Sequence, residues 1–160
     1  MIVLFTAYGM RVSCTGSLPI GLYQAVPGEI ELGSIVGFCP DLTNPVIQAG
    51  RERGYLSPGL LTCEGGIAPL LKYILALPGD RVEVSQENLR VNGHAIENSA
   101  RLAVDGAGRP MPSFPASGEV PPGHAWVFSN YTPGSFDSRY FGSIKASAIL
   151  GKMKPVAVLE

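Results

Sequence analysis

The sequence of 160 residues is poor in charge and in histidine, and it lacks a long hydrophobic run. Charged residues make up 16% of the chain and the formal net charge is -1, so nothing in its composition draws it to nucleic acid. No stretch reaches the ~18 apolar residues that a membrane-spanning helix requires. The two histidines, His94 and His124, are far apart and have no cysteine or aspartate beside them. We therefore expect neither a metal site nor another cofactor, and no nucleic-acid partner.

Glycine and proline are abundant, with 20 and 14 residues respectively. That density interrupts helices and favours short strands joined by turns. The best helical spacing is found in a short segment near residues 45–53. Strand-like runs are more frequent, at residues 33–38, 70–77, 81–84, 89–91, 125–129 and 153–159. We therefore predict a mainly β fold, with antiparallel sheets folded toward a barrel and few short helices.

The length fits a single domain, residues 1–160. Asn92-Gly93 follows a strand-like run and predicts a tight hairpin, because both central positions of such a turn favour positive φ. We expect residues 39–66 and about 85–122 to be insertions on the β core, with a small inserted subdomain.

Ser17 lies between a glycine and a Leu-Pro pair. This pattern favours a stiff, exposed corner on which a hydroxyl can project and nearby backbone N–H groups can point at one spot. Taken alone the pattern is weak evidence, because most Gly-Ser-X-Pro stretches are ordinary loops.

Lys72 interrupts an otherwise apolar strand-like run. Strand alternation places it on the same face as Leu70 and Ile74. Burial of an ammonium group costs several kcal/mol, so a lysine in such a place tends to lose its proton near neutral pH and can then act as a general base. A lysine that extends from an edge strand to solvent would give the same pattern.

Residues 135–142 read Ser-Phe-Asp-Ser-Arg-Tyr-Phe-Gly. Polar groups between aromatics predict a polar network ordered against a core. A purely structural pair of Asp137 and Arg139 under a turn explains the pattern as well.

Together, these three segments resemble the type I signal peptidase superfamily, and in particular its branch of conjugative-transfer peptidases, the TraF family. In that branch the nucleophile segment reads Ser-Met-Pro-X-Gly-Leu-Tyr, and residues 17–23 differ from it only by Leu18. The lysine segment reads Lys-Arg-X-X-(Ala/Gly)-X-Pro-Gly-Asp-X-Val, and Tyr73 stands in place of its arginine. The positions that match are Lys72, Ala76, Pro78, Gly79, Asp80 and Val82. The Asp-Ser-Arg-Tyr-(Phe/Trp)-Gly box is complete at residues 137–142, and the resemblance runs from about Thr15 to the C-terminus.

The resemblance implies a serine endopeptidase with Ser17 as the nucleophile and Lys72 as its general base. The hydroxyl of Thr15 and the backbone N–H of Ser17 would form the oxyanion hole. Ser135 would orient the lysine amine, with Asp137 and Arg139 as a supporting pair.

The resemblance also implies a substrate and a location. The substrate would be an exported pilin precursor, cleaved for conjugative transfer by type IV secretion, and some relatives cyclise their pilin. The enzyme would be held in the bacterial inner membrane by an N-terminal anchor, with the catalytic domain facing the periplasm. Because residues 1–8 are apolar and no charge precedes Arg11, we expect residues 1–13 to be the remainder of that anchor and the native protein to continue upstream.

The implied periplasmic location affects the expected oxidation state of the three cysteines. Disulfides persist in the periplasm, and we predict a bridge between Cys39 and Cys63. Cys14, close to the nucleophile, would remain free.

Three alternatives remain open from the sequence. The chain could be a general type I signal peptidase, or a non-catalytic assembly component of the conjugation machinery. A cytoplasmic self-cleaving protein of the LexA type is the third, and the cysteine pair and the apolar N-terminus disfavour it.

Overall fold

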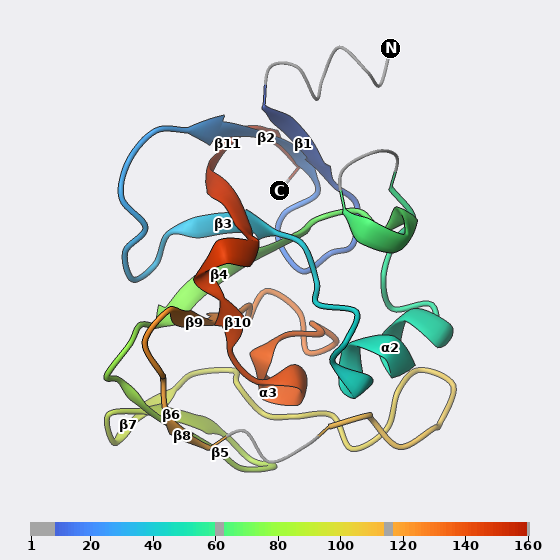
Figure 1. Cartoon of the computed structure of the whole chain (residues 1–160). Coiled ribbons are helices and arrows are strands. Elements are labelled where there is room, and N and C mark those ends of the chain that lie inside the picture. Colours follow the sequence, from blue (N-terminus) through green and yellow to red (C-terminus); the bar gives the residue numbers. More distant parts are fainter. Residues whose placement is uncertain (1–8, 60–62, 114–116, 160) are drawn as a thin grey trace.

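The computed structural model describes residues 9–59, 63–113 and 117–159, and these form two antiparallel sheets (Figure 1). The larger sheet has seven strands in the order β1-β2-β11-β3-β4-β9-β10. Its strands are β1 Met10–Ser13, β2 Gly21–Val26, β3 Ile35–Phe38, β4 Leu70–Ala76, β9 His124–Phe128, β10 Ile144–Lys145 and β11 Ile149–Val158. The mainly β, antiparallel prediction is confirmed. Over the described residues the sheet has two edge strands, β1 and β10. We expected sheets folded toward a barrel, and this sheet does not close into one.

The smaller sheet has four strands in the order β7-β6-β5-β8. Its strands are β5 Arg81–Val84, β6 Leu89–Val91, β7 His94–Ile96 and β8 Gly118–Glu119. Asn92 and Gly93 join β6 to β7 with φ of 50° and 81°, the two positive angles that the sequence predicted for this hairpin. Three of the four strands lie within residues 85–122, the longer of the two predicted insertions.

The predicted helix is α2, Pro45–Glu52. Its first turn is capped by Asn44, whose side-chain oxygen accepts from the N–H groups of Val46 at 2.9 Å and Ile47 at 3.4 Å. Proline at the first helical position loses no hydrogen bond there. The chain leaves the helix at Gly54, which has φ of 78°.

Two elements near the site were not predicted. Strand β2 pairs with both β1 and β11, although Pro19 and Gly21 mark its start as a turn. Helix α3, Ser138–Phe141, is a single turn within the polar box. One of the two partners of β2, strand β11, is distant in the sequence, and local propensity does not register such a partner.

Residues 10–13, at the end of the segment that we expected to be an anchor remnant, form β1 and pair with β2. They are part of the sheet because their backbone groups are satisfied by a neighbouring strand. Residues 1–8 of that segment lie outside the described residues. No helix in the described part of the chain is long and apolar enough to cross a membrane.

The largest core cluster lies where α2 and α3 pack on strands β3, β4 and β9. Its buried side chains include Val36, Phe38, Ile47, Leu70, Ile74, Val127, Phe136 and Phe141. A second cluster, with Val82, Leu89 and Trp126, connects the smaller sheet to the larger one. A third, with Leu18, Tyr23 and Leu71, lies on the other face of β4.

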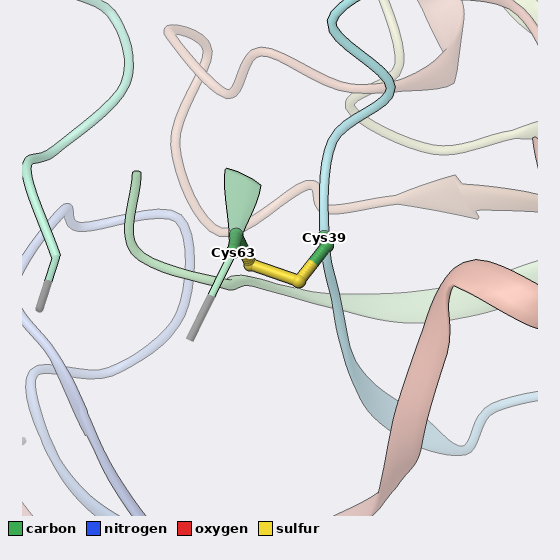
Figure 2. Close-up of a disulfide and its surroundings, with 2 residues drawn as sticks. All are labelled: Cys39 and Cys63. Carbon is green, nitrogen blue, oxygen red and sulfur yellow. A yellow bond between two sulfur atoms is a disulfide. The ribbon is translucent and has the colours of Figure 1, made fainter. Parts of the chain in front are cut away.

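Cys39 and Cys63 form the predicted disulfide (Figure 2). Their Cα atoms are 5.4 Å apart, within the range for such a bridge. Cys39 directly follows β3, and the loop that the bridge closes contains α2. Cys14 is exposed and free, also as predicted.

Candidate active site

Ser17 lies in the turn between β1 and β2, and the residues before and after it fix the conformation of this turn. Gly16 has φ of 67°, a conformation that favours glycine, so the chain can bend sharply before the serine. Leu18, immediately after it, is fully buried. The hydroxyl of Ser129, at the end of β9, donates a hydrogen bond to the Ser17 carbonyl. Ser17 itself is 9% exposed, on a loop that the surrounding structure positions.

Lys72 lies in the middle of β4, between strands β3 and β9, and is 2% exposed. Leu70 and Ile74 on the same strand belong to the main core cluster, as the alternation predicted. The lysine amine donates a hydrogen bond of 2.8 Å to the hydroxyl of Ser135. Because β4 is an inner strand, Lys72 cannot extend past an edge to solvent, which excludes the alternative that the sequence left open.

Burial sets the charge state of this lysine. Desolvation is the main cause that lowers the pKa of Lys72 to about 8; the Asp137 carboxylate raises this pKa and the Arg139 guanidinium lowers it. A measurable fraction of the amine is therefore neutral at neutral pH, and a neutral amine can accept a proton.

Ser135 links Lys72 to a buried ion pair. Its hydroxyl donates to Oδ2 of Asp137 at 2.9 Å. An ionised carboxylate only accepts hydrogen bonds, so the hydroxyl hydrogen of Ser135 is directed at Asp137 and its lone pairs face Lys72. The lysine therefore donates one N–H to Ser135, and its own lone pair remains free to accept from another group.

Asp137 and Arg139 are both fully buried and form a bidentate ion pair. Arg139 donates through Nε to Oδ1 at 2.8 Å and through Nη2 to Oδ2 at 2.9 Å. Its Nη1 donates to the Ala100 carbonyl at 2.8 Å, and the guanidinium lies 4.8 Å from the centre of the Phe128 ring. The backbone N–H of Arg139 also donates to Asp137 at 3.1 Å, which makes Asp137 the N-cap of α3.

Ser17 and Lys72 line one cavity, with a volume of about 210 Å³. Thr15 lines it too and is exposed, and no hydrogen bond occupies its hydroxyl among those described. Ser135 lies behind Lys72 and, with Asp137 and Arg139, forms the buried side of the site. Thr15, Ser17 and Lys72 thus line one cavity, and hydrogen bonds connect Lys72 through Ser135 to Asp137 and Arg139.

A family model described as signal peptidase, peptidase S26, matches residues 1–158. The chain belongs to this family. The resemblance that the three segments indicated is therefore confirmed.

Several relatives of this S26 peptidase carry names that concern conjugation. A probable conjugal transfer protein TraF from Sinorhizobium fredii is 43% identical over 150 residues, which cover 92% of this chain and 77% of the relative. A plasmid transfer protein TraF from Escherichia coli is 37% identical over 151 residues, covering 94% and 83%. A crystal structure of a signal peptidase I from Enterococcus faecalis aligns with 19% identity and a TM-score of 0.43, over 84% of this chain and 100% of that one.

The S26 motifs do not include every residue that shapes this site. Ser129 was predicted only as the end of a strand, yet its backbone N–H donates to Asp137 at 3.3 Å while its hydroxyl holds Ser17. Tyr55, Asp105 and Met111 also line the cavity. They come from the two predicted insertions, and no local pattern marks them.

The chemistry available to this S26 peptidase follows from its side chains. Among the described residues, no group of three or more His, Cys, Asp or Glu side chains gathers as metal ligands. Ser17 and the buried Lys72, whose amine has a lowered pKa, line the same cavity. Together with the family membership, these side chains support a serine peptidase of the signal-peptidase type.

Proposed function

We propose that this chain is a serine endopeptidase whose Ser17–Lys72 dyad cleaves an exported pilin precursor for conjugative transfer. The observation that carries the proposal is the Lys72 amine, buried with a pKa of about 8 and lining the same cavity as the Ser17 hydroxyl. The pilin substrate is supported by the conjugal transfer names of relatives that cover most of the chain.

In the first half of the reaction, neutral Lys72 takes the proton of Ser17 as the serine oxygen attacks the scissile carbonyl carbon. The backbone N–H of Ser17 and the hydroxyl of Thr15 stabilise the negative charge that develops on the carbonyl oxygen. The C–N bond then breaks, Lys72 gives its proton to the leaving amine, and the acyl group remains as an ester on Ser17.

In the second half, a nucleophile attacks this ester and Lys72 takes its proton. Water yields a free carboxylate and a linear product. A primary amine of the substrate yields a new peptide bond and a cyclic product. In both cases the Ser17 oxygen leaves as a hydroxyl, with the proton that Lys72 held.

We also propose that the catalytic domain faces the periplasm and lies against the inner membrane. The Cys39–Cys63 disulfide supports an oxidising compartment. Exposed apolar side chains beside the nucleophile loop support contact with a membrane. Ile20 is 47% exposed and Leu159 is 70% exposed, and the N–H of Leu159 donates to the Ile20 carbonyl at 2.8 Å.

The test is to incubate the purified protein with the pilin precursor of its transfer system and to measure intact masses. Cleavage by the wild type and none by Ser17→Ala supports the proposal, and a product lighter by one water than the trimmed peptide identifies cyclisation. If Ser17→Ala still supports conjugation in cells, the chain is a non-catalytic assembly component. If the wild type processes unrelated exported preproteins equally well, it is a general signal peptidase.

A further inference from the structure

Asp137 binds two serines, and each of these serines contacts one member of the dyad. Its Oδ2 accepts from the Ser135 hydroxyl at 2.9 Å, and Ser135 in turn accepts from the Lys72 amine. The same carboxylate oxygen accepts from the backbone N–H of Ser129 at 3.3 Å, and the Ser129 hydroxyl donates to the Ser17 carbonyl. One oxygen of Asp137 therefore connects the lysine to the nucleophile loop.

The same ion pair also binds the carbonyl groups of both serines. Arg139 Nη2 donates to the Ser129 carbonyl at 3.4 Å and to the Ser135 carbonyl at 3.1 Å. Asp137 and Arg139 are fully buried, so water does not compete for these contacts. Ser129 and Ser135 are thus held from one buried pair of charges.

The hydroxyl of Ser129 has a fixed direction. Ser129 directly follows β9 and is fully buried. Its Oγ accepts from the backbone N–H of Tyr131 at 3.2 Å and donates to the Ser17 carbonyl. Because a carbonyl oxygen can only accept, the hydroxyl hydrogen points at Ser17 and a lone pair points at Tyr131.

The Ser17 carbonyl is a place where a contact can orient the nucleophile. A hydrogen bond there restrains ψ of Ser17, one of the two soft backbone dihedrals of that residue. The chain beyond it is already fixed, because Leu18 is fully buried and the buried Tyr23 phenol donates to the Pro19 carbonyl at 2.9 Å. With ψ restrained against this fixed chain, the direction of the Ser17 side chain is set as well.

We propose that Ser129 is a positioning residue for Ser17, and that the Asp137–Arg139 pair aligns nucleophile and base by holding Ser129 and Ser135 together. This inference rests on the proposed Ser17–Lys72 dyad and adds the residue that orients its nucleophile. Ser129 is not among the described residues that line the catalytic cavity. It therefore acts through Ser17 and does not touch the substrate.

The first experiment measures kcat and KM of Ser129→Ala with the pilin precursor. The variant removes the contact with Ser17, so kcat should fall ~10- to 100-fold, as expected when a reacting group is displaced by about 1 Å. KM should stay within about twofold, because no contact with the cavity is lost. The ascending limb of the pH profile should keep its midpoint, since the side chains around Lys72 are unchanged. A displaced midpoint overturns the positioning role, because it means that the variant disturbs the base.

The matched control is Ser99→Ala. Ser99 is 2% exposed, and its hydroxyl likewise accepts from one backbone N–H, that of Leu89 at 2.9 Å, and donates to one carbonyl, that of Ile96 at 2.5 Å. Both partners belong to strands of the smaller sheet. The two variants should lose comparable free energies of unfolding, since each removes two hydrogen bonds of a buried hydroxyl.

Only Ser129→Ala should lose turnover, and Ser99→Ala should keep the wild-type kcat. If folded Ser129→Ala keeps that kcat too, with the wild type active, the positioning role is overturned while the peptidase function stands. An equal fall of kcat in both variants also overturns it, because the loss would then follow from stability alone.

A second measurement does not depend on catalysis. In ¹³C,¹⁵N-labelled protein, the carbonyl ¹³C resonance of Ser17 should move to higher field in Ser129→Ala, because this carbonyl loses its hydrogen bond. Ser99→Ala should leave the resonance in place. If Ser129→Ala does not fold, Ser129→Cys, with a weaker donor of similar size, takes its place and should show smaller changes in the same directions. An unchanged Ser17 resonance in the folded variant overturns the proposal, even where no turnover is found.

Discussion

Lys72 donates a hydrogen bond of 2.8 Å to Ser135, and this bond orients the lysine amine on the buried side of the site. The Ser135 hydroxyl donates a hydrogen bond to Asp137, which forms an ion pair with Arg139. The hydrogen-bond acceptor of Lys72 is therefore the neutral Ser135 hydroxyl, and the carboxylate of Asp137 is not bound to the lysine directly. Its amine is oriented but its proton is not strongly stabilised, which is what a general base near neutral pH requires.

Loss of either member of the dyad should abolish processing. Ser17→Ala and Lys72→Ala remove the nucleophile and the base, and Lys72→Arg should be equally inactive because a guanidinium remains protonated at working pH. Lys72→Met, which keeps most of the buried volume, should be inactive yet at least as stable as the wild type, since it removes a buried amine. Product mass and thermal unfolding measure the two effects; near-wild-type turnover in any of these variants removes the dyad assignment.

Activity should rise with pH as Lys72 loses its proton. Its pKa of about 8 means that the neutral fraction grows about tenfold per pH unit well below that value and levels off above it. A plot of kcat/KM against pH should therefore show one ascending limb with a midpoint near 8. A limb centred near pH 6.5 would point to a histidine instead.

Removal of the Thr15 hydroxyl should slow the chemical step. Loss of one oxyanion donor typically costs ~100- to 1000-fold in kcat, and the remaining Ser17 N–H should keep the effect of Thr15→Val near the lower end. Thr15→Ser retains the hydroxyl and should restore most of the rate. If Thr15→Val turns over as fast as the wild type, Thr15 serves the fold alone.

The Asp137–Arg139 pair should be the most sensitive point of the fold. Arg139→Met leaves a fully buried carboxylate without its partner, and breaking such a pair typically costs ~3–5 kcal/mol. Urea unfolding of the purified domain measures the loss. The variant Arg109→Met breaks an ion pair with a half-exposed arginine, so it should cost much less.

The disulfide should stabilise the segment that carries α2 and Tyr55. The bridge spans a separation of 24 residues. Closing such a loop contributes ~3 kcal/mol in the chain-entropy model, so Cys39→Ser/Cys63→Ser should lose about that much in free energy of unfolding. Thiol titration of the oxidised, denatured wild type should find one free thiol, that of Cys14. A count of three would refute the bridge.

Much of the scaffold follows from local patterns in the sequence. Period-two alternation and frequent turns predict the antiparallel strands, and Asn92-Gly93 predicts its hairpin because few residues accept positive φ. Alternation also places Lys72 on the face of Leu70 and Ile74. These features depend on residues near one another in the chain.

The candidate site residues could be predicted from the sequence because they lie in family motifs, not because local patterns indicated their geometry. Ser17 alone fits an ordinary loop, and Lys72 alone fits an exposed edge lysine. Only the combination of three segments in a given order pointed to one site. The burial that lowers the pKa of Lys72 depends on β3 and β9 flanking its strand, and strand order is decided by long-range pairing.

By itself, therefore, the sequence determined the mainly β, antiparallel class, the position of α2, the family motifs and which face of β4 carries the lysine. Tertiary structure alone decided that Tyr55 meets Asp105, 50 residues away, and that Ser129 holds Ser17, 112 residues away. Local patterns report which way a side chain points from its own strand or loop. They hold no information on which distant loop lies opposite, because that is settled by packing of the whole chain around its cores.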